Sequence, residues 1–101
     1  NNSYSQTTHT VGASGQDFTT IKDAINDVTV VNGYTIYIAD NVHTEAGIVI
    51  AKNLVIKGQD KETTIVQAAN SLELAENRVF EIPDTVNALI QDLTVRYGNT
   101  F

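Results

Sequence analysis

The feature that most constrains the fold is a single change in the spacing of apolar residues near Gly33. Before it, Ile21, Ala24, Ile25 and Val28 fall at helical spacing, which places all four on one stripe of a helix. After it, apolar and polar residues alternate in short runs, at residues 35–38, 47–50, 54–57, 64–66, 79–82 and 93–97. No second helical pattern separates these runs, so the sequence predicts a mainly β fold and excludes a succession of βαβ units.

Both ends of the predicted helix carry a local signal. Thr20 followed by Asp23 is typical of a capping box, with the shorter Asp in place of Glu, and Asn32-Gly33 supplies the stop. We expect the apolar stripe of this helix to lie across the edge of a core, with its opposite face in water.

Two of the strand-like runs, residues 53–58 and 92–98, are similar to each other. Each has a polar residue, then two apolar residues that flank a third residue, then a basic residue and, shortly after it, a Gly. Leu54 and Leu93 are 39 positions apart, which lies within the periods of about 20–50 residues that indicate repeat architectures. We therefore expect a solenoid in which the second run stacks on the first.

A longer motif spans the helix and the first strand run: Val11-Gly12-x-x-Gly15-x-Asp17-Phe18-x-Thr20-Ile21-x-x-Ala24-Ile25, then Thr35-Ile36-Tyr37-Ile38. It resembles the start of pectin methylesterases and of the wider pectate-lyase-like proteins. The resemblance covers residues 11–98 and implies a right-handed parallel β-helix, of which this chain is the N-terminal cap and first rungs. Where those proteins have Gly-x-Tyr-x-Glu, this chain keeps Glu45 but has Asn41 and His43.

We accordingly divide the chain into a polar N-terminal arm, residues 1–10, and a β-helix segment, residues 11–101. The Thr and Tyr residues of the arm are compatible with a mobile tail or with a strand added to another chain. No capping helix follows the run that begins at Leu93, so further β-helix rungs or other copies of the chain are the expected partners at that end.

Composition narrows the function classes. The net charge is −6 and the six Lys and Arg residues are scattered singly, which argues against nucleic acid and against an anionic membrane surface. No apolar run approaches the roughly 20 residues of a membrane-spanning helix. The absence of Cys excludes disulfides and thiolate metal sites but does not indicate a location. The absence of Met and the polar start are typical of an exported, processed chain, so we expect an extracellular or cell-surface location.

Candidate sites are few, and the resemblance carries no catalytic residue to any position of this chain. His43 near Asp40 and Glu45 has the residue types of a base with its orienting carboxylate or of a weak metal cluster, although a solvated loop is the expected arrangement. Three acidic stretches lack the ligand spacing of a calcium loop: residues 60–62, 73–76 and 40–45. Neither a metal nor another cofactor is predicted.

Aromatic residues offer the remaining candidate contact. Tyr37 lies between Ile36 and Ile38, so its ring is expected on the outer surface, where it would stack on a sugar of a polysaccharide. Tyr34 and Tyr97 are less clearly exposed, and His9 in the arm is expected to be inert.

Three functions stay open at this point. The first is a non-catalytic structural module of an exported β-solenoid, serving as a scaffold, in adhesion or in end-to-end self-assembly. The second is the N-terminal fragment of a polysaccharide-active enzyme of the pectin esterase or pectate lyase type, with its catalytic rungs beyond residue 101. The third is a carbohydrate-binding module.

Overall fold

The computed structural model describes residues 7–75 and 78–98. This part of the chain is mainly β, with one short α-helix and one 3₁₀ turn, and neither helix is long and apolar enough to cross a membrane. In chain order the elements are β1 (Thr8–Val11), α1 (Ile21–Asn26), β2 (Thr35–Ile38), β3 (Val42–Thr44), β4 (Ile48–Val49), β5 (Val55–Lys57), β6 (Ile65–Gln67), η1 (Leu72–Leu74), β7 (Phe80–Glu81), β8 (Leu89–Gln91) and β9 (Thr94–Arg96).

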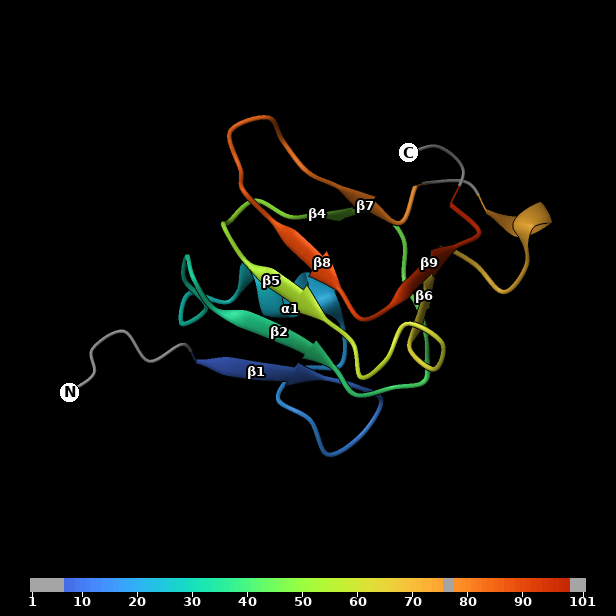
Figure 1. The fold of residues 1–101 in the computed structure, drawn as a ribbon, viewed down its shortest axis with the longest axis horizontal. Helices are drawn as coiled ribbons and strands as arrows, with labels where there is room; N and C mark the ends of the chain where they lie inside the picture. Colours follow the sequence, from blue (N-terminus) through green and yellow to red (C-terminus); the bar gives the residue numbers. More distant parts are fainter. Residues whose placement is uncertain (1–6, 76–77, 99–101) are drawn as a thin grey trace.

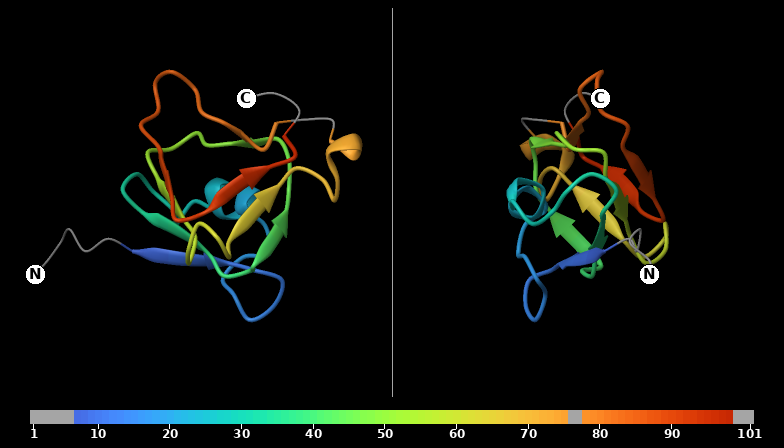
Figure 2. Two further views of the ribbon diagram at one scale, coloured as in Figure 1. Left: turned by 45° about the vertical axis from the view of Figure 1, so that its right-hand side comes forward. Right: turned by 90° about the vertical axis from the view of Figure 1, so that its left-hand side faces the viewer.

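The strands form three parallel sheets, in the orders β1-β2-β5-β8, β3-β6-β9 and β4-β7. The chain visits the three sheets in the same order on successive circuits: β1 stands in the first circuit, β2, β3 and β4 form the second, β5, β6 and β7 the third, and β8 and β9 the fourth. Each circuit therefore lies on the one before it, with β1 at one end of the first sheet and β8 at the other (Figure 1). Figure 2 shows the same stacking from two further directions.

The core lies between the sheets and is built from aligned columns of aliphatic side chains. In the first sheet Ile36 pairs with Ile56 and Ile56 with Ile90, so three isoleucines stack in register on the inner face. Ile36 and Ile56 are fully buried, whereas Ile90 in the last strand is half-buried. The buried apolar residues are Val11, Ile21, Ala24, Ile25, Val30, Ile36, Ile38, Ile48, Ile50, Leu54, Ile56, Val66, Val79 and Phe80.

Helix α1 packs against β1 and β4 through Ile21, Ala24 and Ile25, all of which are buried. Its first turn is capped as the sequence predicts, because the Thr20 hydroxyl accepts a hydrogen bond from the backbone N–H of Asp23 at 3.1 Å. The helix thus buries its apolar stripe beside the first strand of the stack.

The helix is shorter than predicted, and the placement of Val28 on its core face is wrong. Val28 is 89% exposed, and Val30 is buried in its place. The helix ends because the Asp27 carboxylate accepts hydrogen bonds from the backbone N–H and the hydroxyl of Thr29, at 2.8 and 2.5 Å. Such a local turn competes with helical hydrogen bonding, so the chain leaves the helix before Val28 completes the stripe.

The outer edge of β1 is closed by the loop that follows it. The backbone N–H of Thr10 donates to Asp17 at 3.1 Å, and the Thr10 carbonyl accepts from the N–H of Phe18 at 3.0 Å. The N–H of Gly12 donates in turn to the Phe18 carbonyl at 3.0 Å. Because these groups are already bonded, this stretch of the edge offers no ladder to another strand.

Strand β1 also changes the expected N-terminal boundary. Thr8, His9 and Thr10, which we assigned to the arm, pair in register with β2 of the same chain. The boundary at residue 11 therefore falls inside a strand, and these residues add as a strand to their own chain. The Thr7 carbonyl also accepts the backbone N–H of Thr35 at 3.0 Å, and residues 1–6 of the predicted arm lie outside the described residues.

The predicted stacking at 39 positions is also wrong. Val55 pairs with Leu89, which is 34 positions later, whereas the run after Leu93 forms β9 and stacks on β6 of the second sheet. The two runs look alike because the strands here share one pattern, in which apolar side chains that face the core alternate with side chains that face outward. Strands β3 and β8 lie outside the predicted runs, and β8 is the true partner of β5.

Candidate functional site

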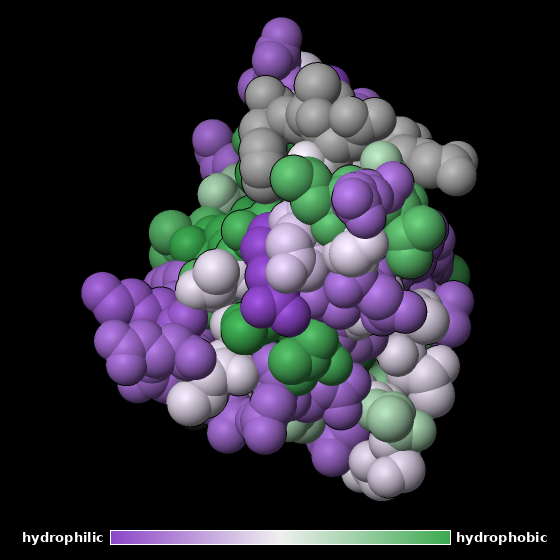
Figure 3. Space-filling model, turned by 90° about the vertical axis from the view of Figure 1, so that its right-hand side faces the viewer, coloured by the Kyte–Doolittle hydropathy of each residue, from purple (hydrophilic) through white to green (hydrophobic). Residues whose placement is uncertain are grey.

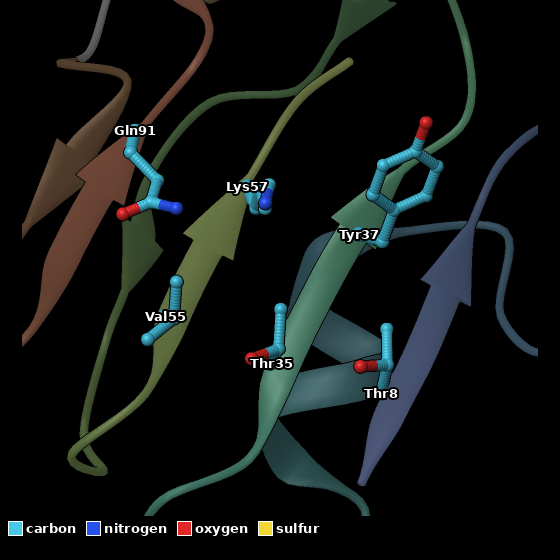
Figure 4. Close-up of a pocket in the computed structure, with 6 residues that line it drawn as sticks. All are labelled: Thr8, Thr35, Tyr37, Val55, Lys57 and Gln91. Atoms are coloured by element: carbon cyan, nitrogen blue, oxygen red, sulfur yellow. The ribbon is translucent and has the colours of Figure 1, made fainter. Parts of the chain in front are cut away.

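An open cleft of about 380 Å³ lies on the outer face of the first sheet. Its lining residues come from all four strands, and their side chains stand on the same side of the sheet (Figure 4). They are Thr8, Thr35, Tyr37, Val55, Lys57 and Gln91.

Strand register explains why these residues meet. Tyr37 pairs with Lys57 and Lys57 with Gln91, so a ring, an ammonium and an amide form one row across three strands. Neighbouring strands are about 4.8 Å apart, so the row spans two strand spacings, close to the size of a sugar unit or two. The Lys57 ammonium lies as far as 3.9 Å from an Asp92 carboxylate oxygen, and both side chains are well exposed. This ion pair therefore holds the ammonium weakly.

The cleft presents an aromatic ring and hydrogen-bonding groups on one face of the sheet. Tyr37 offers the face of a phenol ring to an apolar sugar face, and Lys57 and Gln91 offer hydrogen bonds to hydroxyl or carboxylate oxygens. The six lining residues include no carboxylate, imidazole or thiol, and the ionisable groups among them are the Lys57 ammonium and the Tyr37 phenol.

The outward position of Tyr37 was expected from the alternation of the sequence, and Ile36 and Ile38 on either side of it are buried. Lys57 and Gln91 were not predicted as its neighbours. The register between stacked strands would have identified them. The similarity between residues 53–58 and 92–98, however, predicts stacking for the wrong pair of strands.

A second group of polar residues lies inside the molecule. His43 in β3 is 6% exposed, and its two ring nitrogens contact Asp40 at 3.2 Å and Glu45 at 2.7 Å. Glu45 also accepts the backbone N–H groups of Ile21 and Lys22, at 2.7 and 2.8 Å. The expectation that His43, Asp40 and Glu45 lie on a solvated loop is therefore wrong, since His43 points into the fold from a strand.

The charges of this group reinforce one another. Burial by itself would lower the pKa of His43, but hydrogen bonds and negative charge from Glu45 and Asp40 outweigh it and raise the pKa above its usual 6.5. Burial would raise the pKa of Glu45, but the bonds from His43, Ile21 and Lys22 hold it below its usual value. His43 and Glu45 are thus stabilised as an ion pair.

The other candidate residues have structural neighbours. His9 stacks on Tyr34 with ring centroids 5.7 Å apart and contacts Phe18 edge-on at 5.8 Å. Asp60 accepts the backbone N–H of Glu62 within a turn, at 2.8 Å. Within residues 7–75 and 78–98, no group of three or more His, Asp or Glu residues is arranged to hold a metal ion.

The outer face of the second sheet carries a polar row that is satisfied internally. Gln67, 4% exposed, donates to the Thr44 hydroxyl and accepts from Arg96 Nε, both at 2.8 Å. The Arg96 guanidinium lies 4.7 Å from the ring centre of Tyr97. On the side of the molecule where β6 and β9 lie, the surface mixes hydrophilic and hydrophobic side chains without forming one continuous apolar patch (Figure 3).

Comparison with known proteins adds no family to this description: no family model, curated protein or solved structure matches the chain.

Proposed function

We propose that the chain is a non-catalytic structural module of an exported protein, and that it forms the capped end and first turns of a right-handed parallel β-helix. The order of the strands supports this proposal, because successive circuits through three parallel sheets are the arrangement that such a helix requires. The right hand follows the strong preference of parallel crossover connections. An extracellular or cell-surface location is part of the same proposal.

The difference between the two ends of the stack carries the argument. At the β1 end, Asp17 and Phe18 occupy the strand edge and α1 covers the core. At the β8–β9 end, Ile90 and Val95 are only half-buried, although the residues beneath them in the same columns are fully buried. A further turn laid on β8 and β9 would complete the burial of both columns.

We therefore expect this end to be covered by further β-helix rungs, which would add parallel strands, or by another copy of the chain, whose strands would run antiparallel. Head-to-tail stacking would require the β1 edge, which is closed at Thr10 and Gly12. Two copies would instead meet through their β8–β9 ends, which makes a twofold contact that closes and does not propagate.

Sedimentation velocity across a dilution series tests this role. We expect association that weakens on dilution and is abolished by Ile90→Lys, which places a charge in the open end of the column. Val28→Lys is the matched control, because Val28 is exposed and lies beside α1. A monomer at high micromolar concentration, or association that Ile90→Lys leaves unchanged, would contradict self-association and leave further rungs as the only proposed occupant.

The row formed by Tyr37, Lys57 and Gln91 favours carbohydrate binding as a second function. We expect Tyr37→Ala to abolish chemical-shift changes in a titration with oligosaccharides of polygalacturonate, whereas Tyr37→Phe, which keeps the ring, retains them. No change in the wild-type spectrum would refute the proposal for this sugar. Turnover of polygalacturonate by the purified chain would favour the enzyme-fragment alternative instead.

A further inference from the structure

The contacts of His43 require a particular protonation state. Each ring nitrogen lies against a carboxylate oxygen, Nε2 at 2.7 Å from Glu45 and Nδ1 at 3.2 Å from Asp40. An ionised carboxylate only accepts hydrogen bonds, and a neutral imidazole has only one N–H to donate. With both carboxylates ionised, both contacts are hydrogen bonds only when His43 carries its second proton.

The two carboxylates hold different parts of the cap. Asp40 accepts the backbone N–H of Ala13 at 3.1 Å, in the loop that closes the edge of β1. Glu45 accepts the N–H groups of Ile21 and Lys22 in the first turn of α1. His43 thus links the loop and the helix to each other through side chains of the second circuit.

We propose that Asp40, His43 and Glu45 form a proton-operated latch: doubly protonated His43 fastens the loop and α1 to the second circuit, and loss of its proton releases them. The neutral ring can donate to only one carboxylate, so its other nitrogen faces an acceptor with a lone pair. One of the two hydrogen bonds of the ring is then lost. The Glu45 side chain, which is 8% exposed, also loses the positive charge of His43 that balances its own.

Few other charges act on this group. Among the described residues, Asp40 and Glu45 are the charged groups that shift the titration of His43. The charged residues of α1 are Lys22, whose ammonium lies on the side of Gly47, and Asp23, which is exposed, and β6 places the apolar Val66 opposite His43. The raised pKa of His43 puts the release above pH 6.5, on the alkaline side of the histidine range.

Nuclear magnetic resonance on the whole chain tests the latch. The ring shifts of His43 should give a midpoint above 6.5. As pH rises through that midpoint, exchange protection of the amides of Ala13, Ile21 and Lys22, corrected for intrinsic exchange, should fall by about tenfold for each pKa unit by which the midpoint is raised. The amide of Val55 in the third circuit, which bonds to Tyr34, should keep its protection.

Variants separate the latch from a general effect of pH. His43→Phe keeps a ring but takes no proton, so the pH step in amide protection should vanish, whereas His9→Gln should leave the step unchanged. If His43→Phe fails to fold, the wild-type titration decides alone. A His43 midpoint at or below 6.5, no step at the three cap amides, or an equal loss at Val55 would each overturn the proposal.

Discussion

The packing of α1 allows a sharp test with two substitutions, Ile25→Ala and Val28→Ala. By spacing alone the two residues belong to the same helical stripe. In the structure Ile25 is 1% exposed and Val28 is 89% exposed, because the helix ends at Asn26. The pair therefore measures where the core-facing part of the segment ends.

The expected magnitudes differ several-fold. Ile25→Ala removes three buried carbon atoms, which at about 0.8 kcal/mol each amounts to about 2.4 kcal/mol of lost burial. Incomplete collapse of the cavity adds to this, and the range for such changes is about 2–5 kcal/mol. The better helix propensity of Ala returns only a few tenths of a kcal/mol, so we expect a cost of about 3 kcal/mol. Val28→Ala should stay within about 0.5 kcal/mol of wild type.

Urea unfolding followed by circular dichroism measures both changes. With a slope of about 1–1.5 kcal/mol/M for a chain of this size, Ile25→Ala should lower the midpoint by roughly 2 M or more. Ile25→Asp, which buries an unpaired charge, should prevent folding. Equal losses for Ile25→Ala and Val28→Ala, or an Ile25→Asp protein with an unchanged spectrum and melting temperature, would refute the placement of α1 against the core.

Three further changes test other contacts. Gly58→Ala should destabilise the fold strongly, because an added Cβ would lie 2.3 Å from the carbonyl oxygen of Asp92, and thermal unfolding would show it. Asn53→Ala removes the side-chain acceptor of the Asn87 N–H, a bond of 2.8 Å, and should cost about 1 kcal/mol in urea unfolding. The pKa of Glu45 is lowered in the folded state, so its contribution is present above its usual pKa of 4.5 and is lost as pH falls through the folded value. Glu45→Gln should accordingly flatten the acid side of the stability profile.

Features set by neighbouring residues could be predicted from the sequence. The capping bond between Thr20 and Asp23, the strand at Thr35–Ile38 and the outward position of Tyr37 all follow from spacing within a few positions. The mainly β character, which the alternation predicts, is confirmed, and so are the parallel strands, which the resemblance implies. The β-helix itself and its exported location remain proposals.

Features that depend on distant partners could not be predicted. The alternation that marks a strand does not say which strand lies beside it, so the run after Leu93 was assigned to the wrong sheet. A hydrogen bond from the Thr29 backbone N–H to the Asp27 carboxylate was enough to end the helix early. The burial of His43 depends on the loop and the helix closing over it, which short-range patterns do not report.

The unequal lengths of the circuits bear on how such a chain tolerates change during evolution. Strand β5 pairs with a residue 20 positions earlier, at Thr35, and with one 34 positions later, at Leu89, yet the register on both sides is regular. The additional residues of the longer circuit leave the stack at its corners, as the loop that carries η1 does in Figure 1. Insertions and deletions at these corners can accumulate without shifting any inward column, so new surface loops can be acquired while the core sequence stays under separate selection.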